Sequence, residues 1–168
     1  MLDSHTSHQN RLKANPHLAG KIAGDPNPPG GGEEACAAFG FLRGIRDRAD
    51  AIEFRLTSGN SIWFPYNWLG TMKFNPSVGL LLKFSSDLVY LVLIRGSNLH
   101  CSVEDSGIDL IRAGLQRHRV TWVREMNEED IRQTGEKGPT IDSIDIVEFE
   151  SQNDLRDWLT QNAPTFLS

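Results

Sequence analysis

The sequence predicts a strand-rich α+β domain: an antiparallel sheet of about five or six strands with two or three packed helices. Apolar and polar residues alternate at the two-residue period of a half-buried strand in residues 51–56 and again in 62–66. Residues 107–117 and 151–159 instead carry apolar side chains at helical spacing. With 168 residues and 39% hydrophobic residues, the chain can form one substantial core, and we expect a single domain over 49–168.

The segment before this domain has a different composition. Residues 1–32 end in a run of Pro and Gly and contain too few apolar groups to offset the entropy of ordering, so we expect a disordered tail. A metal site needs several ligands held in fixed geometry, so we interpret the tail histidines as solvated: His5, His8 and His17. Residues 33–48 are Ala-rich and are expected to form a short helical or irregular lead-in.

The first strands of the domain should form a hairpin over residues 51–66, because residues 57–60 supply turn chemistry between two alternating segments. Pro65 cannot donate a hydrogen bond to a neighbouring strand, which predicts an edge or a strand end there. Residues 67–77 contain Gly, Asn and Pro and are expected to be a connection.

The next two strands differ in their predicted surroundings. Residues 80–84 alternate, whereas residues 88–94 are apolar without a break. Such a run, bounded by turn residues, favours a central strand covered on both faces.

The C-terminal third should contain the helices. An N-cap at Asp105 or Ser106 would open an amphipathic helix over 107–117. The other elements expected here are a strand at 120–125, a helical turn from Asn127 to Gln133, a surface loop at 135–139, a last strand at 144–149 and a helix capped by Ser151.

Composition narrows the classes of function. A formal net charge of −5 and a pI near 5.5 argue against a surface that binds nucleic acid through bulk positive charge. Cys36 and Cys101 are far apart in the sequence, and we expect both to be reduced thiols. No apolar run reaches the length of a membrane span, so we expect a cytoplasmic protein without a membrane partner. The sequence predicts no cofactor.

The familiar catalytic motifs are missing. The glycine-containing stretches 30–32 and 40–44 have neither the lysine of a Walker phosphate-binding loop nor a preceding strand. The sequence also contains no Gly-x-Ser-x-Gly nucleophile elbow of a hydrolase, no His-Glu-x-x-His zinc-binding motif and no Cys-x-x-Cys pair. Cys101 and His100 are adjacent, and adjacent residues of an extended chain point to opposite faces, so we do not expect a nucleophile and its base. Four acids suggest a solvated helix start rather than a cation site: Glu125, Glu128, Glu129 and Asp130. We assign no catalytic and no metal-ligating residue.

Two groups of residues remain as candidate binding surfaces. Arg117, His118 and Arg119, followed by Trp122, could hold phosphates or stack on bases, or could serve as helix cap and core. Trp63 and Trp68 crowd one arm of the hairpin; they could meet a partner or lie buried under the 107–117 helix.

One short motif resembles a known family. Leu93-Ile94-Arg95-Gly96-Ser97-Asn98-Leu99 resembles the second signature of the Sm-like proteins, whereas the first signature of that family is missing. The resemblance implies a strongly bent five-stranded barrel, ring assembly and RNA binding, with Arg95 at a base and Gly96 in a turn. The rest of the layout resembles bacterial proteins of unassigned activity.

We therefore expect a strongly bent, barrel-like antiparallel sheet that acts as a non-catalytic binding or assembly module for a protein or a small ligand. One alternative is an Sm-like RNA-binding module that uses Arg95, Asn98 and the 117–119 cluster. Another is an enzyme with His118 as general base and Glu125 as its partner. A homo-oligomer is compatible with all three.

Overall fold

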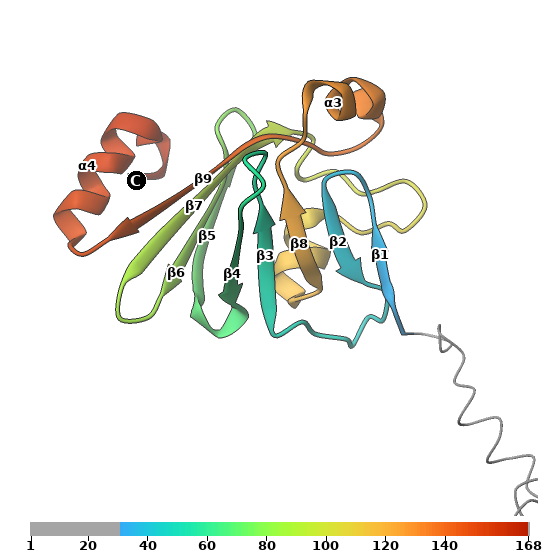
Figure 1. Cartoon of the computed structure of the whole chain (residues 1–168), viewed down its shortest axis with the longest axis horizontal. Coiled ribbons are helices and arrows are strands. Elements are labelled where there is room, and N and C mark those ends of the chain that lie inside the picture. Colours follow the sequence, from blue (N-terminus) through green and yellow to red (C-terminus); the bar gives the residue numbers. More distant parts are fainter. Residues whose placement is uncertain (1–30, 168) are drawn as a thin grey trace, which may run out of the picture. The chain divides into compact units, whose positions relative to one another are not determined.

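The computed structural model describes residues 31–167, which contain nine strands in two sheets (Figure 1). The predicted strand-rich α+β class is confirmed. The prediction of one strongly bent sheet is wrong, because the strands divide into a five-stranded and a four-stranded sheet. Both strand orders have open ends in the described part of the chain, so neither sheet closes into a barrel.

The five-stranded sheet, sheet A, has the order β1 (Glu33–Ala35), β2 (Phe39–Leu42), β8 (Val120–Arg124), β3 (Ala51–Arg55) and β4 (Ser61–Pro65). β8 lies antiparallel to β2 and parallel to β3. β2 and β3 therefore run in opposite directions, and any strand inserted between them must be parallel to one of them. This insertion makes sheet A mixed rather than antiparallel.

The four-stranded sheet, sheet B, is antiparallel throughout and has the order β5 (Leu69–Asn75), β6 (Gly79–Ser85), β7 (Val89–Ser97) and β9 (Thr140–Phe149). β7 pairs with a strand on each side. Its alternate residues enter two different cores, with Leu93 in one and Ile94 in the other. The prediction of a central strand covered on both faces is confirmed.

The larger core lies between the inner faces of the two sheets and includes Phe54 of sheet A and Leu82 of sheet B. The smaller core lies on the other face of sheet B, under α4 (Gln152–Asn162) and the 3-10 turn η5 (Pro164–Leu167). Figure 1 shows α4 beside β9, away from sheet A.

Several local predictions are confirmed. β3 and β4 form the expected hairpin, and Pro65 ends β4, which is an edge strand. Asn127 caps α3 (Glu128–Thr134) by accepting a hydrogen bond from the Asp130 amide at 2.8 Å. Ser151 caps α4 in the same way, with its hydroxyl 3.2 Å from the Asp154 amide nitrogen.

Other predictions are wrong in ways that packing explains. The segment 33–48 contains β1 and β2 rather than a helical lead-in, since Phe39 and Phe41 both enter the larger core at the two-residue spacing of a strand. Gly40 between them leaves room for the indole of Trp122, with which a Cβ would collide. The expected connection at 67–77 instead holds the 3-10 turn η1 (Tyr66–Trp68) and β5.

The predicted 107–117 helix is replaced by two short turns, the π-helical η2 (Leu110–Gly114) and the 3-10 turn η3 (Leu115–Arg117). The N-cap is Asp109 rather than Asp105 or Ser106. The Asp109 carboxylate accepts hydrogen bonds from three successive backbone amides, so the π-helical turn begins three residues later than the predicted start at residue 107. The loop expected at 135–139 carries the 3-10 turn η4 (Gly135–Lys137).

Candidate functional site

A cavity of about 690 Å³ opens where the loop before β3 faces η2 and η3. We call it the basic cavity, since its charged lining residues are Arg48, Asp109, Arg112 and Arg117, together with His118. Three guanidinium charges against one carboxylate leave a formal charge of +2 with the imidazole neutral. This surplus contrasts with the net charge of −5 of the whole chain.

His118 is fixed in the wall of this cavity by its backbone and its ring. It adopts a left-handed conformation with φ of 54°, and its amide donates a hydrogen bond to the Leu115 carbonyl at 3.0 Å. The imidazole stacks on the ring of Tyr66, with centroids 4.5 Å apart and planes inclined by 15°. One face of the ring is therefore covered by Tyr66, and His118 lines the cavity.

Tyr66 is the buried support of this stack. Its hydroxyl donates a hydrogen bond to the Val120 carbonyl at 2.7 Å. Burial raises the pKa of Tyr66 above its ordinary range, because the phenolate would lose its hydration. A neutral, hydrogen-bonded tyrosine thus links the cavity to the start of β8.

The arginines of the cavity are held to different degrees. The Arg48 Nη1 donates to the carbonyls of Ile45 at 3.0 Å and Asp47 at 2.9 Å, which orients its guanidinium without neutralising it. Among residues 31–167, no hydrogen bond or ion pair engages the side chains of Arg112 and Arg117. Two guanidinium groups therefore keep their donors free for a ligand.

Asp109 supplies the carboxylate of this lining, but its oxygens are already occupied. They accept hydrogen bonds from the amides of Ile111 at 3.0 Å, Arg112 at 2.6 Å and Ala113 at 3.3 Å. The carboxylate therefore shapes the cavity wall by capping η2.

A second hollow of about 430 Å³ adjoins the first, since Arg48 and His118 line both. It also contacts Asp50, Tyr66 and Asn67. The His118–Tyr66 stack consequently stands between two hollows that share a guanidinium.

The predicted basic cluster is brought together only in part. Arg117 and His118 line the basic cavity, whereas Arg119 points elsewhere. Its Nε donates to the Leu42 carbonyl at 3.1 Å and its Nη2 to the Arg43 carbonyl at 3.0 Å, so Arg119 holds the end of β2.

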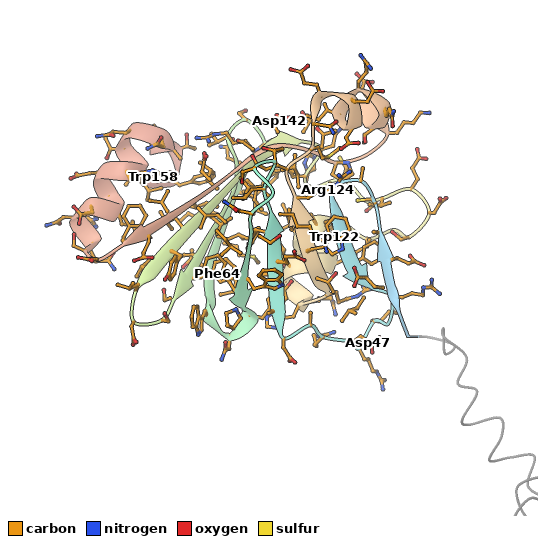
Figure 2. The ribbon with its side chains drawn as sticks, viewed as in Figure 1. Asp47, Phe64, Trp122, Arg124, Asp142 and Trp158 are labelled. Atoms are coloured by element: carbon orange, nitrogen blue, oxygen red, sulfur yellow. The ribbon has the colours of Figure 1, made fainter. Side chains whose placement is uncertain are left out.

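Trp122 is also engaged in the protein. It lies on β8 beside Arg124, as Figure 2 shows, and its indole donates to the Glu33 carboxylate at 2.7 Å. The guanidinium carbon of Arg55 lies 4.4 Å from its ring centroid. One face of the ring is therefore already covered by a cation.

The motif that resembles the Sm-like signature has local structural roles. Arg95 forms an ion pair with Asp145 of β9 and donates to the Asn162 carbonyl at the end of α4 at 3.2 Å. Asn98 has φ of 57° and its side chain donates to the Gly138 carbonyl at 3.4 Å. Neither residue lines the basic cavity.

The expected turn role of Gly96 is wrong, because Gly96 lies within β7. The pairing of β7 with β9 shifts register between Arg95 and Gly96, and a Cβ at this position would collide with the Thr140 carbonyl oxygen. Close approach of the backbones at this irregularity requires glycine.

The argument that separated Cys101 from His100 is also wrong. The Cys101 Sγ lies 3.8 Å from the His100 Nε2, because the chain turns after Asn98 and is not extended there. Neither residue lines the basic cavity.

The acidic cluster is engaged in local contacts. The Glu125 carboxylate accepts hydrogen bonds from the amides of Thr57 at 3.1 Å and Ile144 at 3.3 Å. Asp130 pairs with Arg124 at 3.2 Å. The described residues contain no group of three or more His, Cys, Asp or Glu side chains that could hold a metal ion.

The tail histidines His5, His8 and His17 lie outside the described residues.

Glu125 does not reach His118, because the two residues lie beyond opposite ends of β8. The five residues of β8 that lie between them span roughly 16 Å on their own.

Sequence reasoning missed Arg48 and Arg112 of the basic cavity. Arg48 lies in the loop between β2 and β3, which also carries Arg43 and Arg46, and this local density of positive charge could have indicated a site. Nothing in the sequence indicates that this loop faces η2.

The two candidate partner tryptophans lie in a different hollow. Trp63 is 60% exposed, and Trp68 packs partly against the larger core. Both line a cleft of about 340 Å³ beside β4. The sequence left two alternatives open for Trp63, and its exposure rules out burial under a helix formed by residues 107–117.

We find no family model, no curated protein and no solved structure that matches the chain. Within residues 31–167, no helix has the length and apolar character that a membrane span requires.

Proposed function

We propose that this chain is a non-catalytic binding module whose basic cavity holds a multiply charged anion, such as a phosphate-bearing small molecule. The observation that carries the proposal is the convergence of Arg48, Arg112 and Arg117 on one cavity beside the His118 imidazole. Guanidinium groups bind phosphate or carboxylate oxygens through paired N–H donors.

The fixed parts of the cavity support binding rather than turnover. The Asp109 carboxylate is committed to three backbone amides, and the His118 ring is stacked on Tyr66. Pre-organised donors lower the entropic cost of binding. A general base would need an oriented partner, and Glu125, the partner we considered, is bonded to the amides of Thr57 and Ile144.

The direct test is a titration of the full chain with inorganic pyrophosphate, in which binding is measured by calorimetry and by changes in the backbone amide chemical shifts. We expect saturable binding that weakens with salt, with shifts at Arg112, Arg117 and His118. The variants R112Q and R117Q should each weaken binding by about fivefold or more, as expected for a charge-assisted hydrogen bond.

The matched control is R156Q, which removes one positive charge from α4 outside the cavity. Its affinity should stay close to that of the native chain. Equal losses in R112Q and R156Q, or no saturable binding by the native chain, would contradict the proposal.

Single-stranded RNA is the alternative anion. The Sm-like motif gives it little support, because Arg95 is paired with Asp145. If RNA binds, we expect it to depend on Arg112 and Arg117 rather than on Arg95. RNA binding that is lost in R95Q and retained in R112Q would favour the Sm-like reading instead.

A further inference from the structure

A second site is suggested by the cleft beside β4, which we call the aromatic cleft and define by Trp63, Trp68, Tyr90 and Glu148. Its volume of about 340 Å³ suits a small ligand group. The three aromatic residues come from β4, η1 and β7, and the acid comes from β9. Elements distant in the sequence therefore build one hollow.

The cleft lies on an open edge of the fold. Three consecutive residues of β4 line it, Ile62 to Phe64, and β4 is the last strand of sheet A. Phe64, labelled in Figure 2, closes the inner side with 3% exposure, while Trp63 is 60% exposed. A ligand can therefore reach the aromatic rings from solvent.

The charged group that lines the aromatic cleft is negative. Glu148 is its charged lining residue, and no lysine or arginine of the described chain lines it. Glu148 lies directly opposite Tyr90 in the pairing of β9 with β7, and the Tyr90 ring lies 5.1 Å from that of Phe64 between centroids. Glu148 therefore lies beside the aromatic wall of the cleft.

Aromatic faces and a carboxylate together match one class of ligand. Ring faces carry negative quadrupole potential, so they attract cations that are weakly hydrated, and alkylated ammonium groups are bound in this way by aromatic residues in proteins. A neutral apolar ligand would make no use of Glu148. An anion would be repelled by it.

We propose that the aromatic cleft binds an alkylated ammonium ion, which packs against Trp63 and Trp68 and faces the Glu148 carboxylate. The site is independent of the basic cavity, with which it shares no lining residue. Free choline-like cations and methylated lysine side chains present the same chemistry.

The test follows the indole N–H signals of the four tryptophans in the full chain, assigned by single Trp→Phe variants. Choline should shift the signals of Trp63 and Trp68 in a saturable manner and leave those of Trp122 and Trp158 in place. Its neutral isostere, 3,3-dimethyl-1-butanol, should bind about threefold more weakly or worse.

Variants separate charge from shape. E148Q should weaken choline binding by about threefold or more while leaving binding of the neutral isostere unchanged, and W63L should weaken both. E150Q is the control, since Glu150 is an exposed carboxylate just beyond β9 and outside the cleft. The E148Q and W63L variants are folded if their remaining indole N–H signals keep the positions seen in the native chain and no signals typical of unfolded protein occur.

A trimethyllysine peptide and its unmethylated counterpart distinguish the source of the cation. Preference for the methylated peptide over choline assigns a protein side chain, and the reverse assigns a small cation; both support the proposal. Equal binding of choline and its neutral isostere, equal effects of E148Q and E150Q, or shifts confined to Trp122 and Trp158 would overturn it. No saturable shift with any probe would overturn it as well.

Discussion

The imidazole of His118 lies nearly parallel to the ring of Tyr66, 4.5 Å away between centroids. This contact joins the segment before β8 to the turn after β4. Because the Tyr66 hydroxyl is bonded to the Val120 carbonyl, the stack is anchored to the backbone of β8 as well. Stability and the geometry of the basic cavity therefore depend on the same tyrosine.

Y66F should lower the free energy of unfolding by about 1–2 kcal/mol, because it leaves the Val120 carbonyl without its buried donor. The ring stack survives this change, so pyrophosphate affinity should stay near that of the native chain. Urea unfolding and calorimetry measure the two quantities. A large loss of affinity with unchanged stability would contradict this assignment.

The same substitution should alter stability at alkaline pH. The pKa of Tyr66 is raised in the folded chain by burial, whereas the unfolded tyrosine ionises near pH 10. Stability from this group is present below that pH and falls as pH rises above it, because only the unfolded state then loses the proton readily. Y66F should therefore show a shallower decline in stability above about pH 10. Parallel curves for the two proteins would refute the linkage.

D109N should strengthen pyrophosphate binding by about two- to fivefold, since it removes a negative charge from the cavity and keeps an oxygen that can cap η2. D109A is the comparison, because it removes the charge and the cap together and should destabilise the fold by about 1–2 kcal/mol. Calorimetric titration and thermal unfolding give both results. Weaker binding by a folded D109N would show that Asp109 itself contacts the ligand.

G96A should destabilise the chain by about 2–3 kcal/mol, because its Cβ would collide with the Thr140 carbonyl oxygen at the irregularity between β7 and β9. G70A in β5 is the matched control, since the nearest atom to its Cβ would be the Lys83 carbonyl oxygen at 3.8 Å. Urea unfolding should separate the two variants clearly. Equal stability would mean that the strands can move apart at Gly96 without cost.

A double-mutant cycle of R95Q and D145N should give a coupling energy below about 1 kcal/mol, because the two side chains are 35% and 45% exposed and screened by solvent. R95Q also loses the hydrogen bond to the Asn162 carbonyl, so it should cost more than D145N. Urea unfolding of the four proteins measures the cycle. A coupling energy well above this limit would show that the pair is shielded from solvent.

The local sequence pattern was sufficient to predict an element where the element's own residues determine its burial or its first residue. The apolar run at 88–94 predicted the central position of β7, and the caps Asn127 and Ser151 predicted the starts of α3 and α4. It failed where the decisive contact is distant in the sequence. The pairing of β2 with β8 places Gly40 against the Trp122 indole, and the residues around Gly40 do not indicate that distant contact.

The candidate site follows the same division. Arg117 and His118 were adjacent in the sequence and could be singled out, whereas Arg48 joins them only because its loop meets η2 and η3. Arg95 attracted attention as part of a motif, but its partners lie on β9 and α4. A charged residue near a turn does not disclose whether its partner is a ligand or the protein itself.

The position of β8 between β2 and β3 has a consequence for the order of folding. Until β8 arrives, β1 and β2 are one two-stranded ribbon and β3 and β4 are another, and such ribbons are marginal alone. The antiparallel pairs β5–β6 and β6–β7 connect neighbours in the sequence and can form early. Closure of a long loop must precede the pairing of β3 with β8, so we expect sheet A to be completed late and to set the folding rate.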